Sequence, residues 1–364
     1  AVSGRDYYTR LLTQIAAGDA PDIMQIGDDA VPMFVDKGAL QPLDGFINGE
    51  YPLDTSMYLP TVLQPGQWNG SQYLLPKDFT PLGVYYNRKI FDEYGVGYPV
   101  GQWTWDDLLE KAKELTLDTD GDGETDIWGL QLTANWTTGF EYWIAAQGGY
   151  LIDEQGKTFI GYMDSPEAVE ALQFYADLYN VHQVSPPPAD FNLWAGGNSE
   201  FDNGKAAMRI FGRWPQGGYL ENPNIDLGLI GMPAGTERSN IYFWGGFGIA
   251  STSENPEAAW RFLRYYVGEE GSQVWKDWGI PPVDRVAEEA GMYDDPLEGV
   301  WLDEMYRVRG RAYVFTPYWG EAADPALRKA LETVIIDPDA DVQAVLTQAA
   351  QEAQAVLDEK LAEE

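Results

Sequence analysis

Five acidic residues occupy every second position of one glycine-rich segment, and they are Asp118, Asp120, Asp122, Glu124 and Asp126. This spacing matches positions 1, 3, 5, 7 and 9 of an EF-hand calcium loop, with Glu124 acting through its carbonyl and Gly123 at position 6. Position 12, where that loop carries a bidentate Glu, is Gly129. We therefore interpret the segment as a structural loop that leads into a strand at 127–132. A structural calcium ion and a plain Asp/Gly turn are the two alternatives.

A second set of residues adjoins the ends of expected strands. Ligands of open α/β sheets bind beyond the carboxyl ends of strands. We apply this rule and add two further places, which are the expected crossing of the chain near 245 and the start of a late helix. The residues selected are Asp28, Asp29, Asp78, Asn135, Trp136, Arg213, Trp214, Trp244, Gly245, Gly246, Tyr318 and Trp319. Aromatic faces pack on the apolar C–H faces of sugars, while Asp, Asn and Arg hydrogen-bond sugar hydroxyls. The set therefore favours a carbohydrate ligand.

Each of these residues also has a structural interpretation. Asp28 and Asp29 could cap a helix at 30–37, Arg213 could pair with a surface carboxylate, and Gly245 with Gly246 could serve only to bend the chain. Trp214 and Trp319 could fill the core. For the tryptophans inside expected helices, core packing is the better interpretation, and these are Trp143, Trp260, Trp275 and Trp301.

Composition excludes several classes of function. The 364 residues suggest two domains. With 58 acidic and 23 basic residues, the net charge of −35 disfavours binding to nucleic acid and to anionic membranes. The absence of cysteine excludes disulfides, thiolate zinc sites and cysteine nucleophiles. A Ser-His-Asp triad would have to use His182, the single histidine, which lies at an expected helix end.

Helical and strand patterns alternate along the chain. Strands are expected at 22–26, 71–76, 82–87, 126–132, 205–212, 225–231 and 242–251, and the clearest helices at 104–116, 165–179, 255–268, 325–336 and 340–361. The alternation predicts an α/β fold with mostly parallel sheets. Because the sequence opens at a helix, we expect it to be a fragment without its N-terminal strand and export signal.

Several segments resemble successive landmarks of extracellular solute-binding protein family 1, which includes maltose-binding protein. They are "LLTQIAAGDAPDIMQIGDDAVPMFVDKGALQPLDGFI", "LGVYYNRKIFDEYGV", "TWDDLLEKAKELT", "FEYWIAAQGGYLID", "KAAMRIFGRW" and "FWGGFGIASTSENPEAAWRFLRYYV". They occur in the order of the family and cover nearly the whole chain. The resemblance places Asp29, Trp136, Trp214 and Trp319 nearest to the family's sugar-contacting positions.

The resemblance implies a two-lobe, type II periplasmic-binding-protein fold with a hinge and a ligand cleft. Lobe one would span 1–101 with 245–294, and lobe two 102–244 with 295–364, so that crossings fall near 101, 245 and 295. It also implies a monomeric, extracytoplasmic receptor, either periplasmic or a cell-surface lipoprotein. Such a receptor has no catalytic residue and no required cofactor, and it delivers its ligand to the membrane subunits of an ABC importer.

Two other functions remain open from the sequence. A glycoside hydrolase would need two carboxyl groups facing a sugar, one of them with a raised pKa, and no spacing singles out such a pair. A receptor for another solute, such as a polyamine, would suit the acidic surface and an aromatic cage. Arg213 in the expected cleft argues against a cationic ligand.

Overall fold

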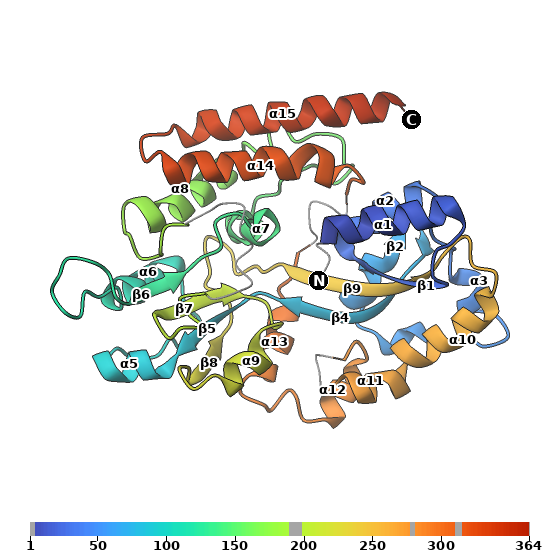
Figure 1. Ribbon diagram of the computed structural model, residues 1–364, viewed down its shortest axis with the longest axis horizontal. Coiled ribbons are helices and arrows are strands. Elements are labelled where there is room, and N and C mark those ends of the chain that lie inside the picture. The colour runs from blue at the N-terminus through green and yellow to red at the C-terminus, as the bar shows by residue number, and fades with distance from the viewer. Residues whose placement is uncertain (1–3, 189–198, 277–280, 310–314, 364) are drawn as a thin grey trace. The chain divides into compact units, whose positions relative to one another are not determined.

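The computed structural model describes residues 4–188, 199–276, 281–309 and 315–363 (Figure 1). Its contacts divide the chain into two compact units. The first unit comprises Ala1–Thr80 with Tyr242–Glu298, and the second comprises Pro81–Ile241 with Gly299–Glu364. The chain therefore passes between the units three times, and each unit is built from segments that are distant in sequence.

The first unit is built on a three-stranded sheet in the order β1-β9-β4. β1 (Ile23–Gly27) pairs antiparallel with β9 (Tyr242–Ile249), and β4 (Leu75–Pro81) lies on the other side of β9. A small hairpin joins β2 (Gln67–Trp68) to β3 (Ser71–Gln72). The helices of this unit are α1 (Gly4–Ala17), η1 (Asp28–Ala30), α2 (Val31–Asp36), α3 (Asp44–Ile47), η2 (Thr55–Met57), α4 (Pro60–Leu63), η3 (Gln64–Gly66), α10 (Pro256–Val267), α11 (Glu269–Trp275) and α12 (Asp284–Glu289).

Trp260 of α10 anchors the core of the first unit. Its side chain is fully buried, its ring stacks on Phe46 at 5.7 Å between centroids, and its Nε1 donates to the carbonyl of Tyr51 at 2.9 Å. This confirms the core interpretation for Trp260, and the burial of Trp143 and Trp301 in the second unit confirms it for them. The side chain of Trp275 lies outside the described part of the chain.

The second unit is built on a four-stranded sheet in the order β6-β7-β5-β8. Its strands are β5 (Gly83–Asn87), β6 (Trp128–Gln131), β7 (Ala206–Phe211) and β8 (Leu227–Ile230). β6 runs parallel to β7, but β5 is antiparallel to both of its neighbours. With β1 and β9 also antiparallel, the expectation of mostly parallel sheets is wrong. A continuous apolar run predicts a buried strand but does not encode its direction.

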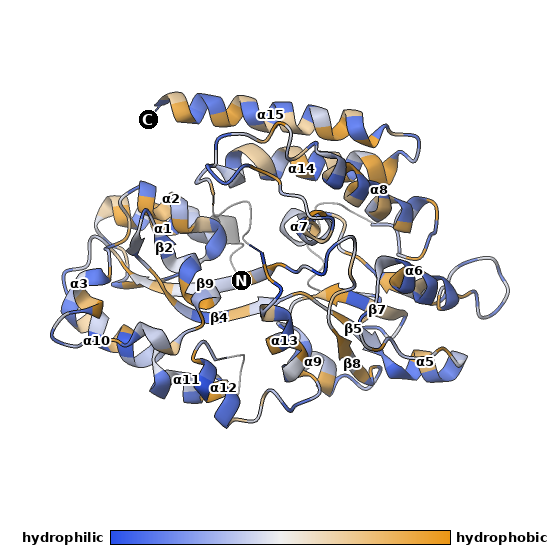
Figure 2. Cartoon of the chain, turned by 180° about the vertical axis from the view of Figure 1, so that it is seen from behind, coloured by the Kyte–Doolittle hydropathy of each residue, from blue (hydrophilic) through white to orange (hydrophobic). Residues whose placement is uncertain are grey.

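Helices surround this second sheet, and several begin where the sequence predicts. Thr104 caps its helix in a reciprocal capping box with Asp107, and Ser165 caps a helix whose first residue is Pro166. The buried residues of α15 recur every three or four positions, as an amphipathic helix requires, and hydrophobic and hydrophilic bands follow one another along this helix (Figure 2). The helices are α5 (Arg88–Tyr94), α6 (Trp105–Glu114), α7 (Thr137–Ala146), α8 (Pro166–Asn180), α9 (Gln216–Glu221), α13 (Glu298–Met305), α14 (Trp319–Ile336) and α15 (Val342–Glu363).

The first crossing differs from the expected one near 101. β5 pairs with β7 and β8, so residues 81–101 belong to the second unit by their contacts. The other two crossings lie within a few residues of the expected 245 and 295. The contacts therefore divide the chain after residues 80, 241 and 298, and the lobe boundaries near 101, 245 and 295 stay a prediction.

A buried carboxylate lies close in sequence to these crossings, within the second unit. Glu304 is 2% exposed, accepts from Asn240 Nδ2 at 2.7 Å and from an Arg307 guanidinium nitrogen at 3.1 Å, and lies 3.6 Å from Arg238. Asn240 also donates to the carbonyl of Leu82 at 2.9 Å. The cluster therefore fastens together the chain segments that leave the second unit.

Two further features bear on the classes of function considered above, namely the hydropathy of the helices and the surroundings of His182. Within the described residues, no helix combines the length and the apolar character that crossing a bilayer requires. His182 follows the end of α8, where partial burial and the nearby charge of Lys113 lower its pKa below the usual 6.5.

We predict that Trp260→Ala lowers the free energy of unfolding by about 3–5 kcal/mol, because it removes a buried indole and leaves a cavity. Denaturant unfolding followed by circular dichroism measures this change. The matched control is Phe262→Ala on the same helix, since Phe262 is 55% exposed and its loss should leave no cavity. Equal destabilisation by the two variants would show that Trp260 is not a core anchor.

We predict that Glu304→Gln changes how stability depends on pH. Burial raises the pKa of Glu304 above its usual 4.5 despite the bond from Asn240 and the charges of Arg307 and Arg238. The native state therefore binds the carboxyl proton of Glu304 more tightly than the unfolded state does. The stability that this difference contributes is fully present below pH 4.5 and is lost as the pH rises through the pKa of the native state. The unfolding free energy of the wild type should fall relative to that of E304Q as pH rises from about 4.5 toward 7. A relative rise would contradict this assignment.

Candidate functional site

Two glycines that pair across neighbouring strands leave one face of the first unit's sheet without side chains at their positions. Gly27 at the end of β1 pairs with Gly245 of β9, so any side chains at these positions would point to the same face. A Cβ on Gly27 would lie 2.7 Å from Asp29 Oδ1, and a Cβ on Gly245 would lie 2.9 Å from Asp78 Oδ1. The glycines therefore make room for two carboxylates above the same part of the sheet.

Tyr8 of α1 holds Asp29, a contact that the sequence interpretation missed. Its hydroxyl donates to Asp29 Oδ1 at 3.0 Å and accepts from the Gly27 backbone N–H at 3.1 Å. Burial, followed by the negative charge of Asp29, raises the pKa of Tyr8 far above its usual 10, so the phenol stays a donor. Tyr8 lies within α1, 21 residues before Asp29, so no local pattern pairs the two residues. Asp29 itself is exposed.

Asp28 and Asp78 differ from Asp29 in their surroundings. Asp28 is 5% exposed and accepts from the backbone N–H of Asp29 at 3.2 Å. Neither Asp28 nor Asp29 caps the following helix, because both lie within η1 and the N-cap of α2 is Ala30. Asp78 lies within β4, is half-buried, and pairs with Lys77 at 2.9 Å. Two of the three carboxylates thus keep access to solvent.

Trp244 and Gly246 lie on the opposite face of β9 from Gly245. Trp244 is 4% exposed, and its Nε1 donates to the carbonyl of Val62 at 2.7 Å. Its ring covers Gly246, where a Cβ would approach to 2.1 Å. The contacts therefore make Trp244 a core residue whose ring needs a glycine beside it, and ligand contact by Trp244 or Gly246 stays a prediction.

An aromatic cluster forms in the second unit from two separate segments. Trp136, at the N-cap of α7, contacts Phe211 at 5.0 Å and Trp214 at 6.1 Å between ring centroids. Phe211 ends β7 and meets Trp214 edge-on at 5.4 Å. Trp136 is 7% exposed and Trp214 is 52% exposed. We call Trp136, Phe211 and Trp214 the aromatic platform, because two supported rings hold a third that remains open to solvent.

The remaining expected contacts of this unit are Asn135 before α7, Arg213 between β7 and α9, and Tyr318 and Trp319 at the start of α14. Asn135 is buried, and its carbonyl accepts from Arg328 at 3.0 Å. Arg213 and Tyr318 are partly exposed, and Tyr318 is the N-cap of α14. Trp319, the first residue of α14, is 4% exposed. Trp214 is therefore the one tryptophan of the expected ligand-contacting set, all within the described residues, that presents a large open surface.

The two units offer complementary chemistry. The first supplies carboxylate oxygens, which accept hydrogen bonds from hydroxyl or ammonium groups. The second supplies an indole face, which suits an apolar C–H surface or a cation. Sugar hydroxyls match the first kind of group, and the apolar face of a sugar ring matches the second.

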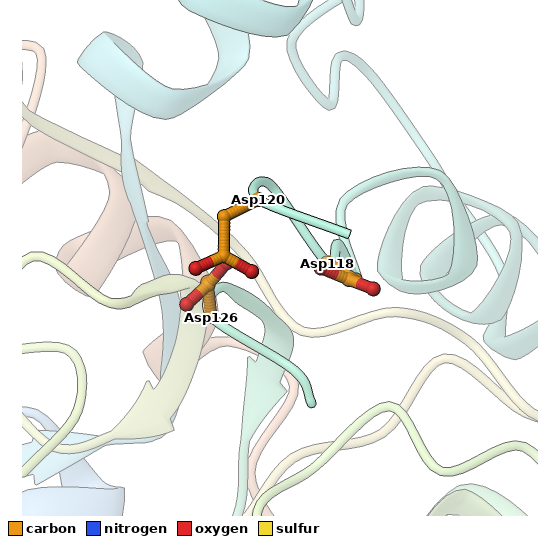
Figure 3. Close-up of side chains that lie close together, drawn as sticks. All are labelled: Asp118, Asp120 and Asp126. Carbon is orange, nitrogen blue, oxygen red and sulfur yellow. The ribbon is translucent and has the colours of Figure 1, made fainter. Parts of the chain in front are cut away.

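The loop at 118–126 is the remaining motif. Ligand oxygens of Asp118, Asp120 and Asp126 lie within 4.8 Å of one another (Figure 3). Asp118 accepts from the backbone N–H groups of Gly121 and Gly123, at 2.6 and 2.9 Å. Hydrogen bonds from Thr119 lower the pKa of Asp126. These bonds form an Asx-type turn from the loop's own groups, and calcium binding by the loop, Asp122 and Glu124 included, stays a prediction.

Comparison with known proteins shows what most of the chain resembles. A model of the family described as bacterial extracellular solute-binding protein matches residues 1–273. The maltotriose-binding protein of Pyrococcus abyssi is 25% identical over 358 residues, which cover 94% of this chain and 72% of that protein.

Solved structures show the same fold. An ABC substrate-binding protein of Listeria monocytogenes in complex with cycloalternan has a TM-score of 0.84 at 23% identity, covering 98% of this chain and 89% of that one. A Mycobacterium tuberculosis protein in complex with glycerophosphocholine has a TM-score of 0.82 at 20% identity, covering 99% and 89%. The expected α/β substrate-binding-protein fold is confirmed.

We predict that EDTA leaves ligand affinity and the fluorescence of the aromatic platform unchanged. The acidic loop precedes β6, whereas Asn135 and Trp136 follow it, so the loop and these residues lie at opposite ends of a strand that is roughly 13 Å long. Titration of the protein with and without EDTA, with circular dichroism as a check on folding, measures the effect. Loss of binding in a protein that stays folded would mean that the loop belongs to the ligand site.

Proposed function

Because the chain belongs to the bacterial extracellular solute-binding protein family, we propose that it captures a carbohydrate and delivers it to an ABC importer. The name of the Pyrococcus relative and the cycloalternan bound to the Listeria protein support an oligosaccharide as the ligand. The family description supports an extracytoplasmic location. We extend the proposal to a monomer that docks on the membrane subunits of the importer.

The aromatic platform is the observation that carries this proposal. Trp214 keeps 52% of its surface exposed while Trp136 and Phe211 contact its ring. An exposed and oriented indole matches the apolar face of a pyranose ring, whose hydroxyls then point outward toward hydrogen-bonding groups. Within the first unit, Asp29 and Asp78 are acceptors of the kind that sugar hydroxyls need.

Catalysis has less support than capture. Family members are solute-binding proteins, and a glycosidase needs an acid with a raised pKa beside a second carboxylate. Glu304 has a raised pKa, but its oxygens accept bonds from Asn240 and Arg307, which fits a structural role. Asp29 is held by Tyr8 as an acceptor. We therefore propose a receptor that returns its sugar unchanged and needs no cofactor.

A solute other than sugar is the second candidate, because the M. tuberculosis neighbour binds glycerophosphocholine on the same fold. A trimethylammonium group or a polyamine could lie against the exposed indole of Trp214. The net charge of −35 favours a cation and disfavours an anionic ligand. The two candidates differ in whether the ligand's charge is needed for binding.

Isothermal titration calorimetry with a ligand panel tests the proposal. The panel contains maltose, maltotriose, a longer maltodextrin, glycerophosphocholine and spermidine, each at low and at high salt. We expect a neutral oligosaccharide to bind with an affinity that salt hardly changes, and chromatography to recover it intact. Binding of spermidine or glycerophosphocholine alone would favour the second candidate, and cleaved sugar would favour an enzyme.

We predict that Trp214→Ala weakens sugar binding at least tenfold. Removing an aromatic anchor commonly costs about 2 kcal/mol of binding free energy, which corresponds to roughly a thirtyfold rise in Kd. Because Trp214 is exposed, the variant should keep its stability and circular dichroism spectrum. The matched control is Tyr306→Ala, which removes another exposed aromatic of the same unit. Equal affinity of wild type and Trp214→Ala would show that the sugar does not use the platform.

A further inference from the structure

The segment that carries Asn135 and Trp136 is tied to α14 by a buried carboxylate. Thr137, the first residue of α7, donates its hydroxyl to Asp324 Oδ1 of α14. Asp324 is 7% exposed. Burial of a carboxylate costs free energy unless the group is paired and hydrogen-bonded, so Asp324 requires specific partners at this position.

Arg328, one helical turn after Asp324, supplies the second tie. One guanidinium nitrogen lies 3.3 and 3.4 Å from the Asp324 oxygens. The other donates to the backbone carbonyl of Asn135 at 3.0 Å. Residues of α14 therefore form hydrogen bonds with the carbonyl of Asn135 and with the hydroxyl of Thr137, the two residues that flank Trp136.

Trp136 passes this constraint to the rest of the platform. Its ring lies against Gly139 of α7, where a Cβ would approach to 2.3 Å, and it contacts both Phe211 and Trp214. The ring therefore has little room to turn unless the segment 135–137 moves. A shift of that segment would move the surface on which Trp214 rests.

We propose that Asp324 and Arg328 are positioning residues for the aromatic platform, acting through Thr137 and Asn135. They touch no ligand. They fix the backbone on both sides of Trp136 and so set the orientation in which Trp214 meets the sugar. The proposal rests on the proposed function for its effect on affinity, but the positioning of the two rings can be measured without any ligand.

The test removes one hydroxyl and then restores it. Thr137→Val keeps the branched shape but cannot donate to Asp324, whereas Thr137→Ser keeps the donor. The protein is labelled with 5-fluorotryptophan, and the fluorine resonances of Trp136 and Trp214 are assigned from Trp136→Phe and Trp214→Phe. We expect both resonances to shift or broaden in T137V and to keep their wild-type positions in T137S. Affinity for maltotriose should fall about fivefold or more in T137V and recover in T137S.

The matched control is Lys329→Met, the next residue of the same helix. Lys329 forms an exposed ion pair with Glu352 of α15 at 2.8 Å and makes no link to the 135–137 segment among its described contacts. Its replacement should change neither resonance nor the affinity. Thermal unfolding of each variant separates a loss of stability from a change in ring position.

The outcomes separate this inference from the proposed function. Unchanged resonances in T137V, or resonances altered equally in T137S, would overturn the positioning role. A wild-type protein that binds no sugar, with the resonances still altered in T137V alone, would overturn the proposed function and leave the positioning role supported. Altered resonances with unchanged maltotriose affinity would show that ring position does not control binding, which would also overturn the inference.

Discussion

A tryptophan that stays half exposed to water keeps one orientation only when rigid neighbours support it. Trp214 has such support from Phe211 at the end of β7 and from Trp136 at the start of α7. β7 is completely buried between β6 and β5, and α7 is held from α14, so both supports belong to the packed body of the second unit. The exposed ring is thus the outer end of a chain of contacts that begins in the core.

In the first unit, space for the candidate ligand-contacting groups comes from glycines, which have no side chains. Gly27 and Gly245 leave space above the sheet, and Asp29 and Asp78 reach into it. Tyr8 remains a donor because burial and the charge of Asp29 raise its pKa, so it holds Asp29 as an acceptor. A rigid apolar plane and fixed hydrogen-bond acceptors are what a neutral sugar requires, and neither depends on the net charge of the chain.

The sequence predicted local features well because they depend on neighbouring residues. The helices expected to begin at Thr104 and Ser165 are present. Six of the seven expected strands appear with shifted ends, and the seventh, at 71–76, is divided between β3 and β4. Strand direction was not predictable, since the pairing of β5 with β7 and β8 depends on distant segments. For the same reason, the contacts that place 81–101 in the second unit leave no local signal.

The candidate site was predicted in part. Exposed Asp29 and Trp214 were chosen because they follow strands, whereas Trp244 was chosen at a crossing of the chain and Trp319 at the start of a late helix, and both of these are buried. Burial depends on tertiary packing, so the place of a tryptophan along the chain does not decide whether its ring is open to solvent. Tyr8 and Asp324 act through contacts 21 and 187 residues away in the sequence, which no spacing rule reveals.

A crystal structure of the protein with the oligosaccharide that binds most tightly tests the central claim most directly. The account predicts that one sugar ring lies with its C–H face against the indole of Trp214, whose ring stays in contact with Trp136 and Phe211. A sugar bound elsewhere on the chain, with Trp214 still facing water, would contradict it.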